Sequence, residues 1–308
     1  MRVGITGGLG FIGSNLAKGL INSNFEVKVL DDLSTGLKEN LLGFNYEFVH
    51  SSILDEKSVS KFFDDLDFVF HLAARGSVPR SFAFQKLTYD VNTLGSVSIL
   101  EEARIRAIPI ILISSSSVFG SANTGARSES DSKNPISPYA VSKLAMEMAS
   151  QVNRINYAQD SLVIRLFNVF GPLQRSDHEY AAVIPKWISA AIKGEPLNIF
   201  GDGKQSRDFT YVNDVVEILI SCLSRPEIFK IPELNVGFGC PIELNKIIEI
   251  LKKDFNDLTV KHSPSRVGDI SRSLNDTTLF RSIFNNFQPT PIAEAIKGTL
   301  DWFLRDKN

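Results

Sequence analysis

The sequence predicts an α/β fold built on a doubly wound parallel sheet, and three observations point to this class. Short β-branched runs alternate with helical patterns through the first half of the chain. A glycine-rich turn at residues 7–13 directly follows the first of these runs. The 308 residues, 43% hydrophobic and 22% charged, suffice for one large globular domain or two modest ones. Such alternation favours parallel strands joined by right-handed helical crossovers.

Strands and helices of the first half are expected where the hydrophobic period changes. Runs rich in β-branched and aromatic residues predict strands at 2–6, 26–30, 46–49, 68–71, 110–114 and 162–166. Helical periodicity predicts helices at 10–22, 59–64, 88–106 and 139–156. Because ligands bind beyond the carboxyl ends of the strands in such sheets, functional residues are expected directly after these runs.

The alternation weakens after about residue 165, where glycines and prolines divide the chain into shorter pieces. A helix is expected at 184–192, a short strand at 197–200, a helix at 212–223 and a late strand of the first sheet at 234–236. We therefore expect a first domain of residues 1–167 plus about 209–237. A smaller, interleaved α/β domain would take about 168–208 plus 238–308.

Composition excludes several classes of protein. A net charge of −2 gives no reason to expect nucleic acid or an anionic membrane as partner. Cys222 and Cys240 have no metal or redox spacing, and the four histidines are scattered, so no metal site is expected. No leader pattern precedes the first strand, and the apolar stretch 108–113 is far short of the roughly 20 residues of a membrane helix. A cytoplasmic location is expected.

Three glycines predict a dinucleotide site. Gly7 would permit a tight turn, Gly10 would let the backbone approach a pyrophosphate, and Gly13 would allow close packing of helix on strand. The N–H groups at the start of the helix, at Phe11 and Ile12, would then face the phosphates. This combination of strand, turn and helix is typical of a Rossmann-type domain.

Acidic residues after the second and third strands refine this site. Asp31 is placed to bind both ribose hydroxyls of an adenosine, and Asp32 adds repulsion against a 2′-phosphate, so NAD is favoured over NADP. The alternative is a polar turn with a helix cap. Asp55 would bind the adenine amine or merely cap the helix that follows it.

Tyr139 and Lys143 lie four residues apart in a predicted helix, which puts both side chains on one face. A nearby ammonium favours the phenolate and lowers the pKa of a tyrosine from its usual value of about 10. The spacing alone also occurs by chance on helix surfaces. Here it follows a cluster of serines at 114–117, which suggests a common site.

In this order, the glycine turn, the serines and the Tyr-x-x-x-Lys motif resemble the extended short-chain dehydrogenases, and within them the nucleotide-sugar 4-epimerases. The resemblance covers nearly the whole chain. The matching segments are 31–36, 71–74, 76–81, 115–120, 165–172, 201–203 and 206–209. Segments 76–81 and 181–187 are most similar to bacterial UDP-N-acetylglucosamine 4-epimerases.

The resemblance implies roles for three residues. Tyr139 would remove the proton of the sugar 4-hydroxyl while hydride passes to NAD, and the return of hydride to the other face of a 4-keto sugar would invert C4. Ser115 would bind the 4-oxygen; its alternative role is to cap a turn. Lys143 would bind the nicotinamide ribose and lower the pKa of Tyr139. Related dehydratases carry acids where this chain has Ser116 and Ser117, which disfavours dehydration.

The family pattern also implies binding residues. For NAD these are Gly7, Gly10, Phe11, Ile12, Gly13, Asp31, Asp32, Ile53, Asp55, Leu72, Ala73, Ala74, Tyr139 and Lys143. For a UDP-sugar they are Ser77, Arg80, Ser115, Ser116, Asn168, Ile199, Arg207, Arg266, Asp269 and Ser273. Surface salt bridges are the alternative for Arg207 and Arg266, and a solvated loop is the alternative for Ser77 and Arg80.

Ser273 occupies a position where relatives restricted to unacetylated sugars carry a bulky tyrosine, so it would leave room for a 2-acetamido group; alternatively it is an ordinary loop residue. We therefore expect an NAD-dependent 4-epimerase of UDP-GlcNAc and UDP-GalNAc. The alternatives are a UDP-glucose or UDP-glucuronate 4-epimerase and a non-catalytic NAD-binding sensor. The resemblance implies a homodimer, for which helices 88–106 and 139–156 are the candidates, although stripes facing the core would give the same pattern.

Overall fold

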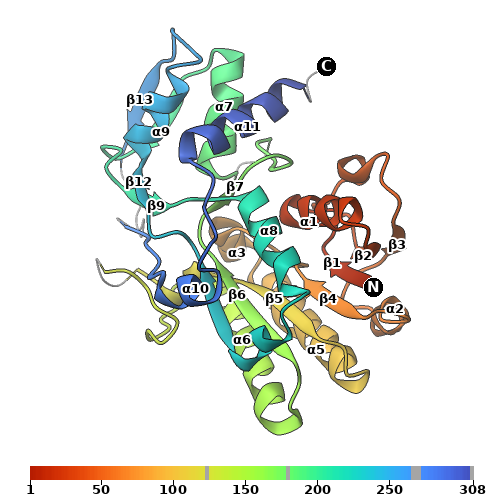
Figure 1. Ribbon diagram of the computed structural model, residues 1–308. Helices are drawn as coiled ribbons and strands as arrows, with labels where there is room; N and C mark the ends of the chain where they lie inside the picture. The colour runs from red at the N-terminus through yellow and green to blue at the C-terminus, as the bar shows by residue number, and fades with distance from the viewer. Residues whose placement is uncertain (122–124, 178–180, 265–271, 306–308) are drawn as a thin grey trace. The chain divides into compact units, whose positions relative to one another are not determined.

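The computed structural model describes residues 1–121, 125–177, 181–264 and 272–305 (Figure 1). The chain divides into two compact units that alternate along the sequence. Unit 1 comprises Met1–Gly120, Ser132–Arg165 and Val216–Leu234. Unit 2 comprises Ser121–Asp131, Leu166–Val215 and Asn235–Asn308.

A seven-stranded sheet with the order β11-β6-β5-β4-β1-β2-β3 forms the centre of unit 1. The strands are β1 Arg2–Thr6, β2 Glu26–Asp31, β3 Glu47–His50, β4 Phe68–His71, β5 Ile110–Ser115, β6 Ser161–Leu166 and β11 Glu233–Val236. Pairing is parallel on both sides of β1, with β2 and with β4. The predicted doubly wound sheet is thus confirmed, and the chain reverses its winding direction at β1, where ligands bind in such folds.

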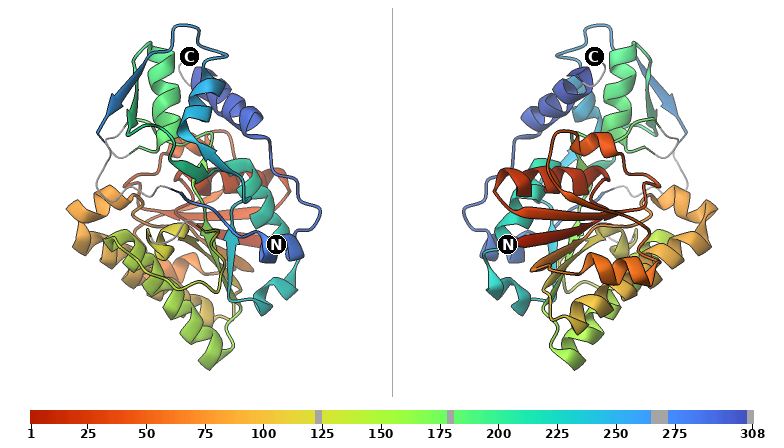
Figure 2. Two further views of the ribbon diagram at one scale, coloured as in Figure 1. Left: turned by 90° about the vertical axis from the view of Figure 1, so that its left-hand side faces the viewer. Right: turned by 90° about the vertical axis from the view of Figure 1, so that its right-hand side faces the viewer.

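Helices cover both faces of this sheet, as Figure 2 shows. They are α1 Phe11–Asn22, α2 Glu56–Phe62, α3 Val78–Ala83, α4 Gln85–Tyr89, α5 Ser96–Ile105, α6 Pro138–Tyr157 and α8 Val212–Cys222, with short helical turns η1 Lys38–Leu41, η3 Ser116–Phe119 and η4 Pro226–Lys230. On one face, Gly19 of α1 allows close approach of Val216 and Ile220 of α8. On the other face, α5 packs between α2 and α6.

The predicted helix 88–106 is interrupted by a π-helical segment, η2 Asp90–Gly95. Inside this segment Asn92 is fully buried, and its side-chain amide bonds Arg75 and Ser142 rather than solvent. π-helical turns often occur where a side chain is needed at a functional position. The interruption was not predicted, because an extra residue in one turn leaves the apolar periodicity nearly unchanged.

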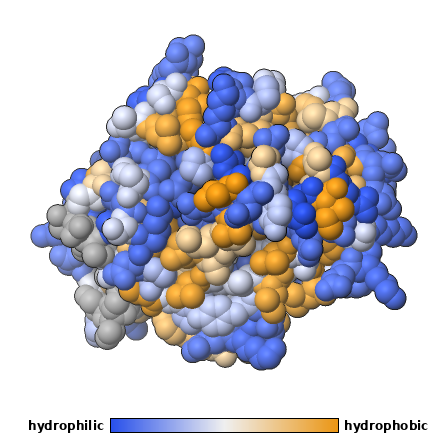
Figure 3. All heavy atoms as spheres, turned by 90° about the horizontal axis from the view of Figure 1, so that it is seen from below, coloured by the Kyte–Doolittle hydropathy of each residue, from blue (hydrophilic) through white to orange (hydrophobic). Residues whose placement is uncertain are grey.

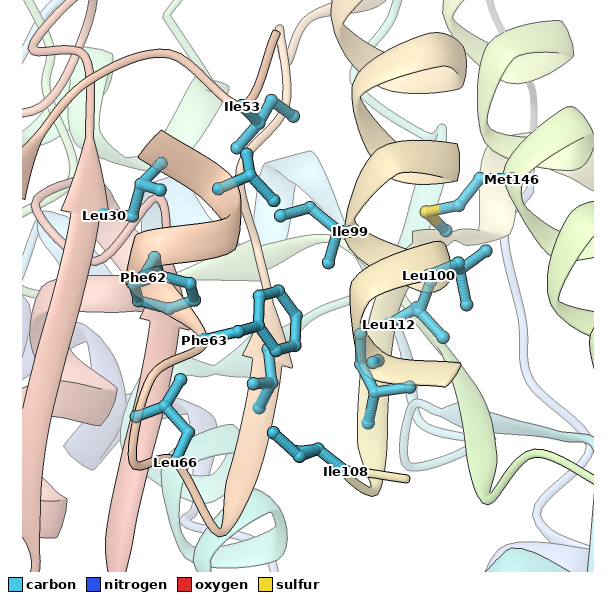
Figure 4. Packing of buried hydrophobic residues seen from close by; sticks show 14 of the residues in the cluster. Leu30, Ile53, Phe62, Phe63, Leu66, Ile99, Leu100, Ile108, Leu112 and Met146 are labelled. Carbon is cyan, nitrogen blue, oxygen red and sulfur yellow. The ribbon is translucent and has the colours of Figure 1, made fainter. Parts of the chain in front are cut away.

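The main hydrophobic core of unit 1 lies between the sheet and helices α2 and α5 (Figure 4). Phe62 and Phe63 are completely or almost completely buried in it and meet edge to face, with ring centroids 5.6 Å apart. Burial of one such ring contributes on the order of 2–3 kcal/mol. Ile99 of α5 and Leu112 of β5 belong to the same core. The strand that ends at Ser115 is therefore packed against the helices of this face.

The strands of unit 2 are short, with two to four residues each. Its helices are α7 Val183–Lys193, α9 Leu244–Leu251, α10 Thr278–Ile283 and α11 Ile292–Arg305. Its strands form three pairs: β7 Val169–Phe170 with β10 Thr210–Tyr211, β9 Ser206–Asp208 with β12 Pro241–Glu243, and β8 Leu197–Phe200 with β13 Val260–Ser263. The expected helix 184–192 and strand 197–200 are present.

None of the helices in the described part of the chain is long and apolar enough to cross a membrane. The same residues contain no cluster of three metal-ligating side chains.

Candidate active site

The glycine turn after β1 has the shape that a dinucleotide pyrophosphate needs. Gly7 has a φ of +69°, and a Cβ atom there would lie 2.7 Å from the backbone nitrogen of Ala73. A Cβ atom on Gly13 would lie 2.2 Å from the Gly7 carbonyl oxygen. Gly10 caps α1 without a side-chain hydrogen bond, so the first N–H groups of the helix keep their capacity to donate to an anion.

Asp31 is fixed beside this turn. Its Oδ2 accepts a hydrogen bond from the Leu9 N–H at 2.9 Å, and its Oδ1 accepts one from the Leu33 N–H at 2.8 Å. Burial raises the pKa of Asp31, and these two backbone donors oppose that rise. Because Leu9 belongs to the glycine turn, the Asp31 carboxylate is tied to that turn as well as to the polar turn at Leu33, and its contact with an adenosine ribose stays a prediction.

Other predicted NAD residues surround the same edge of the sheet. Backbone atoms of Leu72 and Ala73 pack against Gly7, and the Ala73 N–H donates to Thr6 Oγ1 at 3.2 Å. Ile53 is buried against Gly95.

The position of the Asp55 carboxylate matches one of its two expected roles. It caps α2, accepting hydrogen bonds from the Lys57 N–H and the Ser58 hydroxyl, and the Ser58 bond lowers the pKa of Asp55. The contact of Asp55 with an adenine stays a prediction, as does that of Ala74 with NAD.

Ser115 and Tyr139 are brought together from β5 and α6. The helix begins at Pro138, and the Ser137 hydroxyl accepts a hydrogen bond from the Ala140 N–H at 3.1 Å. Tyr139 is therefore in the first turn of α6, where the helix dipole favours an anion. Burial raises the pKa of Tyr139, while a side-chain hydrogen bond with Ser115 lowers it. Ser115 also caps η3, which is its alternative role, and its contact with a sugar 4-oxygen stays a prediction.

Lys143 is buried one helical turn after Tyr139. Its Nζ donates a hydrogen bond to the Ile113 carbonyl oxygen at 2.8 Å. Burial lowers the pKa of Lys143 to about 8, and the negative charge of Glu147 opposes this fall. The net pKa of Tyr139 lies above its usual value, contrary to the sequence expectation, because loss of hydration outweighs the hydrogen bond with Ser115.

A buried polar chain behind this pair was not predicted. His71, which is completely buried on β4, contacts Thr6 Oγ1 at 2.7 Å through Nδ1 and Ser96 Oγ at 2.8 Å through Nε2. The Ser96 hydroxyl donates to the Asn92 carbonyl oxygen, and burial lowers the pKa of His71 to about 3. The imidazole is therefore neutral and orients the ends of β1 and β4.

Asn92 continues this chain to α6. Its Nδ2 donates to Ser142 Oγ at 3.0 Å, and the Ser142 hydroxyl donates to the Tyr139 carbonyl oxygen at 2.8 Å. The signal that could have found this network is the recurrence of polar residues at 88, 92 and 96, four apart on an otherwise apolar helix face.

Unit 2 gathers three of the predicted substrate residues. Asn168 Nδ2 donates to the Asp208 carbonyl oxygen at 3.1 Å and to Ser273 Oγ at 3.3 Å. Arg207 is on β9, next to Ser206, whose carbonyl oxygen accepts a hydrogen bond from the Ser273 N–H. The side chain of Asp208 fixes this arrangement, because it accepts hydrogen bonds from the N–H groups of 238, 239 and 275.

The remaining predicted substrate residues are more dispersed. Ile199 is buried in β8, and Ser77 is the N-cap of α3, accepting a hydrogen bond from the Arg80 N–H at 3.4 Å. Ser116 begins η3 directly after Ser115. Arg266 and Asp269 lie outside the described residues.

Comparison with known proteins agrees with this geometry. The model of the NAD dependent epimerase/dehydratase family matches residues 3–237. A putative UDP-glucose 4-epimerase of Methanocaldococcus jannaschii is 34% identical over 304 residues, 97% of each chain.

Solved structures give the same result. A UDP-N-acetylglucosamine 4-epimerase of Methanobrevibacter ruminantium, in complex with UDP-N-acetylmuramic acid, is 35% identical with a TM-score of 0.92, covering 99% of this chain and 98% of that one. A UDP-glucose 4-epimerase of Thermus thermophilus, in complex with NAD, is 30% identical with a TM-score of 0.88 over 99% of both chains.

The fold and site define a dinucleotide-dependent enzyme of the extended short-chain dehydrogenase type. The chain belongs to the NAD dependent epimerase/dehydratase family. Its cofactor is NAD, and the glycine turn and Asp31 described above fit that cofactor.

Proposed function

We propose that the protein is a UDP-sugar 4-epimerase that interconverts UDP-GlcNAc and UDP-GalNAc. The observation that carries this proposal is the pairing of the Tyr139 side chain with Ser115 at the end of β5, where Ser115 lowers the pKa of Tyr139, with the buried Lys143 one helical turn away. The relatives named above, which are described as 4-epimerases, support the same reaction.

Each member of this site has a distinct task. Tyr139 takes the proton of the sugar 4-hydroxyl and later returns it, and Ser115 holds the 4-oxygen during that transfer. Bound NAD would supply the reversible hydride acceptor and a positive charge that favours the phenolate. The Lys143 ammonium adds a second positive charge. Its hydrogen bond to the Ile113 carbonyl oxygen fixes it to β5. Turnover of a 4-keto sugar within the site then leads to inversion at C4.

The alternative chemistry in the family name, dehydration, needs an extra acid and base beside the sugar. Ser116 and Ser117 occupy the positions after Ser115, and neither can supply a carboxylate. The nearest buried carboxylate on α6, that of Glu147, is already paired with Arg165. Epimerisation therefore fits the site better than elimination.

A 2-acetamido sugar is favoured by the small side chain at Ser273. Its hydroxyl accepts a hydrogen bond from Asn168, and a tyrosine at this position would extend well beyond that contact. UDP-glucose and UDP-glucuronate are the alternative substrates.

The decisive assay is proton NMR of the sugar during incubation of the NAD-loaded enzyme with UDP-GlcNAc. Appearance of UDP-GalNAc at equilibrium with UDP-GlcNAc is expected. Conversion of UDP-glucose or UDP-glucuronate alone would show that the proposed substrate is wrong and that the proposed reaction, 4-epimerisation, is right. No conversion of any of these three UDP-sugars would contradict the proposal and favour a non-catalytic NAD sensor.

A homodimer is part of the proposal, with a second copy of the chain packed against α5 and α6. Large apolar side chains at positions 94, 97 and 105, and at 141, 148, 152 and 155, are 40–72% exposed, so these stripes do not face the core. Figure 3 shows hydrophobic groups between polar ones at the molecular surface. Light scattering should give twice the mass of one chain, and Ile155→Glu with Met148→Glu should give the monomer; a monomeric wild type would refute the dimer.

A further inference from the structure

Three paired charged side chains, those of Glu147, Arg165 and Glu233, form a line in unit 1 that contacts Ser114 on β5. The Glu147 carboxylate, 5% exposed, pairs with the completely buried guanidinium of Arg165, with 2.7 Å between Oε2 and Nη2. The Arg165 Nε donates to both carboxylate oxygens, at 3.0 and 3.2 Å. The Ser114 hydroxyl donates a further hydrogen bond to Oε1. This carboxylate is therefore fixed from β5 and β6 while it stands on α6.

At its other end the line reaches the surface. Arg165 also pairs with Glu233, whose side chain is 24% exposed and accepts a hydrogen bond from Lys133 at 2.9 Å. The Arg165 guanidinium lies over the Phe119 ring, 5.2 Å from its centroid. Arg165 thus has two carboxylate partners, and the one on α6 is Glu147.

Glu147 follows Lys143 by one helical turn, as Lys143 follows Tyr139. Residues at intervals of four share one face of a helix, so the three side chains form a row on α6. The row is pinned to β5 at successive residues, because Lys143 donates to the Ile113 carbonyl oxygen and Glu147 accepts from Ser114. The next residue of that strand is Ser115.

We propose that Glu147 is a positioning residue: its anchored carboxylate keeps the buried Lys143 ammonium charged, one turn from Tyr139. Burial of an ammonium costs free energy, and a fixed opposite charge nearby lowers that cost. The hydrogen bond of Lys143 Nζ goes to the Ile113 carbonyl oxygen, and Glu147 acts on the ammonium through its charge. Burial lowers the pKa of Lys143 to about 8, and without this carboxylate it would fall further.

Other charged or titratable groups near Lys143 do not replace Glu147. His71 on β4 interacts electrostatically with Lys143, but its pKa of about 3 keeps it neutral at any pH used for an assay. Burial raises the pKa of Tyr139 on α6, which disfavours its negatively charged form in the absence of NAD. Arg165 on β6 lies behind Glu147 and carries the opposite sign.

The test compares Glu147→Gln with Glu233→Gln. Both variants remove one carboxylate from Arg165, but only the first removes a charge next to Lys143. The primary readout is the titration of Lys143 in the NAD-loaded enzyme by NMR of ¹³Cε-labelled lysine, with the signal identified by its loss in Lys143→Met. Glu147→Gln should lower the Lys143 pKa by about one unit, and Glu233→Gln should leave it unchanged.

The pH dependence of kcat is the second readout and rests on the proposed function. The alkaline limb should move to lower pH by the same amount in Glu147→Gln, with about a fivefold loss at pH 8 for a one-unit shift. Substrate KM should change little. The lysine titration needs no substrate, so a shifted titration without turnover would contradict the proposed epimerase and still support the role of Glu147.

An unchanged Lys143 titration in a folded Glu147→Gln protein would overturn the inference. An equal shift in Glu233→Gln would also overturn it, because the effect would then come from disturbing Arg165. If Glu147→Gln does not fold, Glu147→Gln with Arg165→Met removes both buried charges and leaves Glu233 with Lys133. The Lys143 pKa must fall in this double variant too, and a value at the wild-type level would refute the inference.

Discussion

The proposed catalytic region of unit 1 and the proposed substrate-binding region of unit 2 are built in different ways. Ser115, Tyr139 and Lys143 stand on a long strand and a 20-residue helix, and buried hydrogen bonds fix the elements behind them. Arg207 stands on a three-residue strand, and Asn168 and Ser273 lie in connecting segments. Regular elements hold the reaction geometry constant, whereas short segments allow the substrate to change among relatives.

The largest effect is expected from a substitution in the proposed catalytic region. Tyr139→Phe keeps the half-buried ring but removes the hydroxyl that we propose exchanges a proton with the sugar. We expect kcat to fall by about a hundred- to ten-thousand-fold. Calorimetric titration should show NAD affinity within a few-fold of wild type. Turnover within tenfold of wild type would mean that another group is the base.

The NAD turn and a turn of unit 2 offer a matched pair of glycines. Gly13→Ala places a Cβ atom 2.2 Å from the Gly7 carbonyl oxygen, so the turn must open. Gly194 ends α7 with a φ of +71° and open space around its Cα, so Gly194→Ala costs only about 1 kcal/mol of backbone strain.

We therefore expect Gly13→Ala to weaken NAD binding at least tenfold and Gly194→Ala to leave it unchanged. Calorimetric titration with NAD measures both affinities. Thermal unfolding should show a small loss of stability for Gly194→Ala. Equal NAD affinity in the two variants would show that the turn after β1 tolerates opening and does not hold the pyrophosphate.

The difference between the two regions also explains how far sequence reasoning reached. Alternating periodicity predicted the strands of unit 1 to within a residue or two, and the glycine turn and Asp31 lie together in the structure as expected. The π-helical segment around Asn92 and the link from His71 to Ser96 were missed, because buried polar partners distant in sequence leave only a weak pattern.

In unit 2, sequence reasoning predicted α7 and β8 but none of the contacts of Asp208. That carboxylate binds backbone N–H groups of residues 238, 239 and 275, and backbone donors have no residue signature. The proximity of Ser273 to Asn168 likewise depends on segments about a hundred residues apart. Motif resemblance, rather than periodicity, was the source of both residues as candidates.

A smaller effect concerns stability and pH in unit 1. The pKa of His71 is lowered to about 3 by burial, against 6.5 in the unfolded chain. Between these values the unfolded chain binds more protons than the folded one, so His71 makes stability fall as the pH is lowered from 6.5 towards 3. Between pH 7 and pH 4.5 this amounts to roughly 2–3 kcal/mol.

Urea unfolding at the two pH values measures this effect against the background of the carboxylates. His71→Gln should lose about that much of the pH dependence, and replacement of the exposed His50 by glutamine should retain it. An unchanged pH dependence in His71→Gln would mean that the imidazole is hydrated or protonated in the folded protein. The polar chain to Asn92 would then need another explanation.

The smallest effect is expected from a substitution in the proposed substrate-binding region of unit 2. Ser273→Tyr replaces a hydroxyl that accepts a hydrogen bond from Asn168 with a ring directed into the same segment. If Ser273 leaves room for a 2-acetamido group, the ratio of kcat/KM for UDP-GlcNAc to that for UDP-glucose should fall by about ten- to a hundredfold, as a steric change of this size predicts. Ser273→Ala is the control and should keep the ratio, because it removes the hydrogen bond but no space. A ratio unchanged in Ser273→Tyr would reduce Ser273 to a connecting residue, and a ratio changed equally in both variants would assign the effect to the bond with Asn168.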